Sequence, residues 1–295
     1  MTSAARTDVG TIEDLHASAT RATGFDDFGD TEYLEPLGIL LDSYRSEAGL
    51  TELGSKMFRF FLKGALVARL LSEASWKANP GHADVEITRP IFVTGLPRTG
   101  TTALHRLLAA DPAHQGLEMW LAEFPQPRPP PRHLGRQPGV PADPGRLRAA
   151  PRREPGVHGS ALHGRRRGRG MLAAVAAERY VDLLRIARHI PTYSRWLAQQ
   201  DWTPAYLRHR KNLQLIGLND PGKRWVLKNP SHLFALDALM AAYPDALVIQ
   251  THRAPSTIIA SMCSLAEHAT PWLVDDLHRR PDRTGPAGAV VPRAS

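Results

Sequence analysis

Residues 90–102 read Pro-Ile-Phe-Val-Thr-Gly-Leu-Pro-Arg-Thr-Gly-Thr-Thr and are the most informative residues of the chain. A β-branched and aromatic run, Ile91 to Val93, stops at Gly95 and gives way to a helix-compatible run at 103–108. The pattern predicts a strand, a tight loop and a helix N-terminus. The first amides of a helix have no acceptor within the helix, and with the helix dipole behind them they bind phosphate well. The loop is therefore predicted to hold a phosphate group.

The cation of this loop is unusual for a nucleotide-binding loop. The spacing from Gly95 to Gly100 matches a P-loop, but Thr101 stands where that motif has Lys. The missing Lys argues against an ordinary ATPase or GTPase, and Arg98 supplies the cation instead. This pattern resembles the 5′-phosphosulfate loop of sulfotransferases that use 3′-phosphoadenosine-5′-phosphosulfate (PAPS). The resemblance implies that the 5′ end of PAPS is bound by five residues of this loop: Arg98, Thr99, Gly100, Thr101 and Thr102.

Strand-like and helix-like segments alternate again later in the chain. The run 224–228 predicts a strand, and residues 233–243 recur at helical spacing with Ser231 as the predicted N-cap. The short apolar run 247–249 is long enough only for a strand, which we predict to be buried. These runs predict a further strand–helix–strand unit of an α/β sheet.

Arg253 follows the last of these strands, at the carboxyl end where ligands bind in open parallel sheets. The 3′-phosphate motif of the sulfotransferases is an Arg that ends a strand and a Ser in the next helix. The resemblance, and not spacing alone, selects Ser261 over Ser256 or Thr257. Two phosphate motifs in this order imply a P-loop-like, three-layer αβα core with a central parallel sheet, preceded by an N-terminal helical region.

The predicted organisation has five parts. An N-terminal helical region spans 1–89, and the two halves of the core span 90–124 and 171–270. The segments 125–170 and 271–295 lack Phe, Tyr, Met, Ile, Asn and Lys altogether. Such compositions cannot build an apolar core, so both segments are predicted to be aberrant or disordered.

Two interpretations of 125–170 remain open. It is either a natural Pro/Arg-rich loop or a GC-rich reading frame shifted after about Phe124, restored between Met171 and His189 and lost again near Thr270. We favour the frame hypothesis, because the breaks fall between well-patterned segments. Members of the family also continue well beyond the 3′-phosphate helix. The chain is therefore predicted to be a frame-disrupted, C-terminally truncated member, and a non-functional remnant is the alternative to an active enzyme.

The charge of the chain does not indicate a nucleic-acid partner. The net charge is +8, but the segment 125–170 holds 11 Arg against only Asp143 and Glu154. The basic character therefore belongs to one segment and not to a face of the fold. That segment has no aromatic residue on which a base could stack. We expect no nucleic acid among the partners.

The cysteine count and the hydropathy pattern argue against further classes of protein. Cys263 is the only cysteine, so no disulfide within the chain or cysteine metal cluster is expected, and no metal site is predicted. The resemblance places this thiol in the helix after Arg253, where we expect it to be buried. The amino terminus has no apolar signal-peptide core, and Arg59 and Lys63 interrupt the apolar window 57–71. A cytoplasmic protein without a transmembrane segment is expected.

The resemblance also implies the catalytic residues. Sulfuryl transfer needs a clamp on the donor phosphates, charge relief at the transferring group, and a base for the acceptor hydroxyl. Cytosolic sulfotransferases use a His near a Lys at the end of a strand, here Lys228 and His232, although the family places the two closer together. Tyrosylprotein sulfotransferases and some bacterial relatives use a Glu downstream of the loop Arg, a place that Glu118 occupies. The base is predicted to be Glu118 or His232, with Lys228 as a secondary stabiliser.

The predicted function is a PAPS-dependent sulfotransferase that acts on a hydroxyl of a small molecule, lipid or sugar. A P-loop small-molecule kinase is the alternative. It would need a Lys at position 101 and a Mg²⁺-binding Asp at the end of a strand. Here the strand at 246–251 is followed by His252 and Arg253.

Overall fold

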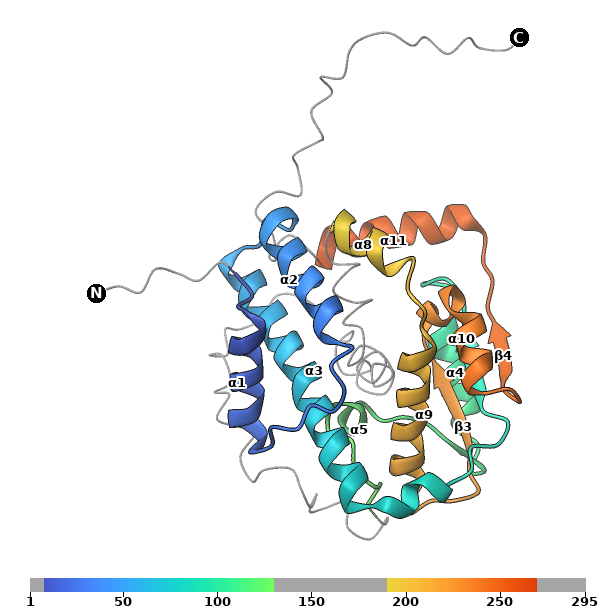
Figure 1. Ribbon diagram of the computed structural model, residues 1–295. Helices are drawn as coiled ribbons and strands as arrows, with labels where there is room; N and C mark the ends of the chain where they lie inside the picture. Colours follow the sequence, from blue (N-terminus) through green and yellow to red (C-terminus); the bar gives the residue numbers. More distant parts are fainter. Residues whose placement is uncertain (1–7, 130–189, 270–295) are drawn as a thin grey trace, which may run out of the picture.

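The structure, a computed structural model, describes residues 8–129 and 190–269 (Figure 1). Apart from 125–129, the segment predicted to be aberrant at 125–170 lies outside the described residues, and so does the tail 271–295. The frame hypothesis therefore stays a prediction.

The centre of the fold is a sheet of four parallel strands. Their order across the sheet is β2-β3-β1-β4, so that β1 pairs with β3 on one side and β4 on the other. Parallel strands are connected by crossover segments, usually helices, so strands that follow one another in the chain need not be neighbours in the sheet. The predicted parallel sheet is confirmed, with strands β1 (Ile91–Thr94), β2 (His114–Gln115), β3 (Arg224–Lys228) and β4 (Leu247–Gln250).

Side chains of the strands alternate between two separate apolar clusters, as the pleat of a strand requires. One face of the sheet packs on α4 (Thr101–Leu108) and presents Ile91, Val93 and Val226. The other face packs on α9 (Thr203–Gly217) and α10 (Leu236–Ala242) and presents Phe92, Trp225 and Leu227. The sheet is thus covered on both sides, which gives the predicted three-layer αβα arrangement.

Two local predictions about the second half of the core are wrong. The strand β4 is not buried, since Leu247 is 46% exposed and β1 is the only described partner of β4. An apolar run alone cannot distinguish an edge strand from a central one. The helix after β3 is also not capped by Ser231. The carbonyl oxygen of the Asn229 side chain accepts from the Ser231 amide at 3.2 Å and starts a 3₁₀ turn, η4 (Pro230–Phe234), ahead of α10.

Three helices precede the sheet and confirm the predicted helical region. They are α1 (Ile12–Thr23), α2 (Leu34–Glu47) and α3 (Glu52–Ala78), followed by the short turn η1 (Pro80–Asp84). In Figure 1 the three helices lie together beside the sheet. The helix α8 (Pro191–Leu197) shares their core through Tyr193 and Leu197. The region therefore takes part of its core from residues far along the chain.

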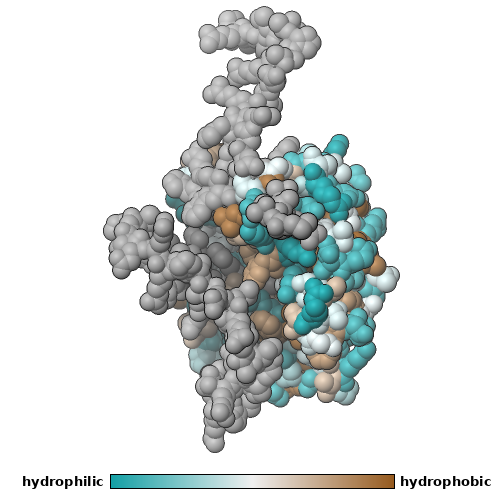
Figure 2. Space-filling model, turned by 90° about the vertical axis from the view of Figure 1, so that its left-hand side faces the viewer, coloured by the Kyte–Doolittle hydropathy of each residue, from teal (hydrophilic) through white to brown (hydrophobic). Residues whose placement is uncertain are grey.

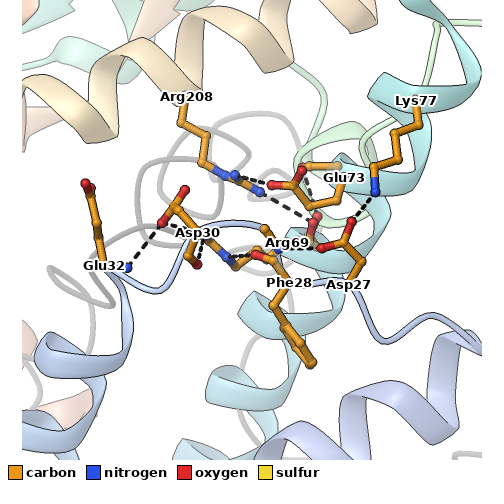
Figure 3. A network of polar contacts seen from close by, with 11 residues as sticks. Asp27, Phe28, Asp30, Glu32, Arg69, Glu73, Lys77 and Arg208 are labelled. Carbon is orange, nitrogen blue, oxygen red and sulfur yellow. Dashed lines mark hydrogen bonds and ion pairs between the residues drawn. The ribbon is translucent and has the colours of Figure 1, made fainter.

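A network of charged side chains connects this helical region to α9 (Figure 3). Arg208 of α9 forms an ion pair with Glu73 of α3 at 2.6 Å, and the two side chains are only 9% and 14% exposed. The Arg208 guanidinium also lies 4.4 Å from the centre of the Trp76 ring. Behind them, the buried Arg69 binds Asp30 at 3.0 Å. The helical region is thus fixed against the layer that covers the sheet.

Several large apolar side chains are exposed among the described residues, including Phe60, Leu107 and Phe234. The face shown in Figure 2 is mostly hydrophilic, with a smaller hydrophobic patch. Within the described residues, no helix has both the length and the apolar character that crossing a bilayer requires. The last described helix, α11 (Pro255–Ala269), exposes Cys263, so the prediction of a buried thiol is wrong. The sequence predicted that Cys263 lies in a helix but did not predict which side of that helix faces the core.

Candidate active site at the carboxyl edge of the sheet

The predicted strand, loop and helix N-terminus are present as β1, residues 95–100 and α4. The loop turns through three positive φ angles, 134° at Gly95, 74° at Arg98 and 94° at Gly100. A Cβ at Gly95 would lie 2.5 Å from the carbonyl oxygen of Thr251, so only glycine fits there. A left-handed Arg is strained, and such strain is concentrated at functional sites.

The helix α4 directs its first amides into this loop. Gly100 is the N-cap, and the first amide with an acceptor in the helix is that of Ala103, which donates to the Gly100 carbonyl at 3.0 Å. The amides of Gly100, Thr101 and Thr102 precede it, at the positive end of the helix dipole. The loop is braced from β4, because the hydroxyl groups of Thr99 and Thr251 lie 2.6 Å apart.

The two predicted phosphate motifs meet in space. Arg98 Nε donates to Ser261 Oγ at 2.8 Å across 163 positions of sequence. Arg253 Nη1 donates to the backbone carbonyl of Arg98 at 3.3 Å. Both Arg side chains belong to exposed residues, and no carboxylate in the described ranges forms an ion pair with either. The site thus presents two guanidinium groups whose charge is available to an anion.

Further predicted residues extend along the same edge of the sheet. Val93 pairs with Lys228, so Lys228 ends β3 directly beside the loop that follows β1. Gln115 ends β2 paired with Trp225 of β3, and Glu118 follows three residues later, ahead of α5. Neighbouring strands lie about 4.8 Å apart. Along one edge the order is therefore Glu118, Lys228, the loop with Arg98, and Arg253.

Glu118 lies at the open end of this row. It is the N-cap residue of α5 (Met119–Glu123), and its side chain is 44% exposed. Arg128 Nη2 donates to its Oε2 at 2.9 Å. Among the described residues, no donor binds the other oxygen, Oε1. Glu118 is thus a carboxylate with one oxygen held by Arg128 and the other without a hydrogen-bond donor among the described residues.

His232 lies in the interior and not at the surface. Its Nδ1 is 2.5 Å from the Tyr206 hydroxyl, and its ring meets Phe92 edge-on with 5.1 Å between ring centres. Burial places the pKa of His232 well below its usual value, and the neighbouring His209 and Lys228 lower that pKa further. The ring is therefore neutral. Its Nε2 is buried and has no hydrogen-bond partner in the described part of the chain.

Comparisons with known proteins identify the family of this chain. A model of the sulfotransferase family matches residues 90–285, which is more than half of the chain. This chain belongs to the sulfotransferase family. The crystal structure of the sulfotransferase STF1 from Mycobacterium tuberculosis H37Rv superimposes with a TM-score of 0.80 at 59% sequence identity. That match covers 91% of this chain and 74% of STF1.

A more distant sulfotransferase shares the fold. The crystal structure of STF9 from Mycobacterium avium has a TM-score of 0.72 at 24% identity, and the match covers 87% of this chain and 66% of STF9. A search of curated proteins finds no match. As a member of the sulfotransferase family, the chain is a transferase with the P-loop-like α/β fold.

Sequence reasoning missed one residue at this sulfotransferase site, Arg128. It lies beyond the boundary predicted at Phe124, yet its amide donates to the Ile216 carbonyl at 3.0 Å. Its own carbonyl accepts from the Asn219 side chain at 3.1 Å. The packed chain therefore continues through 125–129. No local pattern identifies this Arg, because all its partners lie elsewhere in the sequence.

The described residues also contain no group of three His, Cys, Asp or Glu side chains arranged to hold a metal ion. The charges that converge on the edge of this sulfotransferase are instead those of Arg98, Arg253 and Lys228. An arrangement of cations and helix amides binds an anion directly.

Proposed function

We propose that this protein transfers a sulfuryl group from PAPS to a hydroxyl group of a small molecule, lipid or sugar. The observation that carries the proposal is the contact of Arg98 with both Arg253 and Ser261. It joins a phosphate loop to a second cationic site at the next strand end. Such a pair suits a nucleotide that has anionic groups at both its 3′ and 5′ positions.

The residues fit that donor. Its 5′ end would be held by Arg98, the Thr99 hydroxyl and the amides of 100–102, and its 3′-phosphate by Arg253 and Ser261. A guanidinium binds two phosphate oxygens at once, which suits this role. Nothing lies within 4 Å of a Cβ built on Gly100, so the loop is open on that side. When bound, PAPS supplies the activated sulfuryl group.

Lys228 and Glu118 complete the proposed chemistry. Lys228 ends the strand beside the loop, where its charge would stabilise negative charge that develops on the transferring group. Glu118 is the better candidate for the base, because it is half-exposed and has an oxygen available to accept a proton. His232 is buried, and its contacts with Tyr206 and Phe92 give it a supporting role that holds η4 against the core.

A binding experiment tests the proposal before any acceptor is known. The full chain is heated with adenosine 3′,5′-bisphosphate, adenosine 2′,5′-bisphosphate or adenosine 5′-monophosphate. We expect the 3′,5′-bisphosphate to raise the melting temperature most, because it engages both Arg253 and the loop. A folded sample that millimolar 3′,5′-bisphosphate fails to stabilise would contradict the proposal. Selective stabilisation by ATP–Mg²⁺ would favour the kinase alternative.

Transfer itself is tested with PAPS and a phenol such as 2-naphthol. Sulfated product is the expected result. Tight binding of the bisphosphate without transfer to any phenol, alcohol or sugar would indicate a remnant that keeps only the donor site.

A further inference from the structure

Arg128 is the central residue of a polar cluster at the end of β2. Its side chain is 14% exposed, and its guanidinium lies 5.5 Å from the centre of the Trp225 ring. Its nitrogens donate to four acceptors that come from two separate parts of the chain: Gln115 Oε1 at 2.6 Å, Gly116 O at 2.8 Å, Glu118 Oε2 at 2.9 Å and Asp220 Oδ2 at 3.3 Å.

These contacts fix the guanidinium from two sides. Nη1 is held by the side chains of Gln115 and Asp220, and Nη2 by the carbonyl of Gly116 and the carboxylate of Glu118. A planar guanidinium whose two terminal nitrogens are both occupied has little rotational freedom. The position of Glu118 is therefore set by residues of β2 and of the turn between α9 and β3.

We infer that Arg128 is a positioning residue for the proposed base, fixing the Glu118 side chain at the edge of the sheet. The inference rests on the proposed function. A general base is commonly oriented by a third group. Arg128 supplies that orientation through Oε2 alone, which leaves Oε1 for the proton of the acceptor.

A labelling experiment tests the pairing without any need for turnover. A water-soluble carbodiimide reacts with protonated carboxyl groups, and mass spectrometry measures labelling of Glu118 against Glu123 in the same peptide. Partial burial raises the pKa of Glu123, so this residue labels readily and serves as the internal reference. We expect Arg128→Gln to raise the Glu118/Glu123 labelling ratio several-fold, and Arg128→Lys to raise it less. An unchanged ratio in both variants would overturn the inference.

A double-mutant cycle separates positioning from mere support of the fold. Arg128→Gln, Glu118→Gln and the double variant are compared in kcat for transfer from PAPS to 2-naphthol. We expect the double variant to be no slower than Glu118→Gln alone, with affinity for the 3′,5′-bisphosphate unchanged throughout. If the losses of kcat in the two single variants multiply in the double variant, the result counts against the inference that Arg128 acts through Glu118. A wild type that binds the bisphosphate but neither transfers nor hydrolyses PAPS would also count against that inference.

Arg208→Gln is the matched control. Arg208 also forms a largely buried ion pair with a Glu and lies over a Trp ring, but it connects α9 to α3 away from the sheet edge. The Arg208→Gln variant should have a lower melting temperature, and its effect on kcat should multiply with that of Glu118→Gln. If Arg208→Gln lost as much kcat as Arg128→Gln, the inference would be overturned. A wild type that does not bind the bisphosphate defeats the proposed function instead, and the labelling ratio still decides whether Arg128 holds Glu118.

Discussion

The two ends of the active-site edge are built in different ways. At the donor end, β1 with its loop and α4, and β4 with α11, are contiguous strand–loop–helix units whose ligand residues follow the strand directly. At the base end, β2 has only two residues, and Glu118 is positioned through Arg128. Each proposed phosphate motif is thus a contiguous unit of sequence, whereas the proposed base is held by contacts with residues outside its own unit. Mutations at the two ends should separate affinity from turnover.

The largest expected effect comes from the base end. Glu118→Gln should lower kcat by about 10²- to 10⁴-fold, the usual contribution of a general base, with the affinity for bisphosphate unchanged. His232→Gln should mainly lower the melting temperature, because the ring is buried against Tyr206 and Phe92. Steady-state kinetics and calorimetric titration of both variants measure this. The opposite result, a slow but stable His232 variant and a fast Glu118 variant, would return the role of base to His232.

The next largest effect belongs to the donor end. Arg98→Ala removes a charged hydrogen-bond donor, which contributes roughly 1.5–3 kcal/mol, so the Kd for the bisphosphate should rise about 10- to 150-fold. Arg106→Ala removes a cation from the far end of the same helix and serves as the control. Equal losses in the two variants would mean that only the overall charge matters, and the local construction of the donor end would then be in doubt.

The strand–loop–helix units of the donor end could be predicted from the sequence because each unit is contiguous in the chain, while the roles of their residues stay predictions. Gly95 is required by the Thr251 backbone behind it, and Arg98 follows from the spacing of the loop. The choice of Ser261 over Ser256 needed the resemblance to a family, since both lie in α11. In the structure only the contact with Arg98 distinguishes Ser261.

The contacts at the base end could not be predicted from the sequence, because several of them join residues far apart in the chain. His232 was a candidate base, but Tyr206, 26 positions earlier in the chain, buries and binds it. Arg128 lay in a segment whose composition predicted no packing, yet it contacts Asp220, 92 positions away. No periodicity carries such information. Composition describes a segment as a whole and cannot identify the few residues of it that pack against the core.

A third prediction concerns pH and the interior beneath the base end. Burial lowers the pKa of His209 to about 3 and that of His232 well below its usual value. In the unfolded chain both titrate near 6.5, so at pH values below this the unfolded state binds more protons than the folded state. Stability is therefore fully present above about pH 6.5 and is lost progressively as the pH falls.

Between pH 7 and pH 5, His209 should remove about 2 kcal/mol of stability, at 1.36 kcal/mol for each pH unit below 6.5, and His232 acts in the same direction. Urea unfolding at the two pH values measures the loss. His209→Gln should have a lower stability at pH 7 but a smaller loss between pH 7 and pH 5. A His209→Gln variant as acid-sensitive as the wild type would show that His209 is not held neutral in the fold.

The smallest expected effect is that of Ser261→Ala at the donor end. A neutral hydrogen bond contributes about 0.5–1.5 kcal/mol, so the Kd for the bisphosphate should rise only about 2- to 12-fold. Part of this loss is offset, because Ser261 also binds Arg98 Nε when no donor is present, and its removal frees that Arg for the ligand. Ser256→Ala, in the first turn of the same helix, is the matched control. If Ser256→Ala weakened binding of the bisphosphate more than Ser261→Ala did, the 3′-phosphate would lie nearer the start of α11. The two phosphate motifs would then not share one ligand through the Arg98–Ser261 contact.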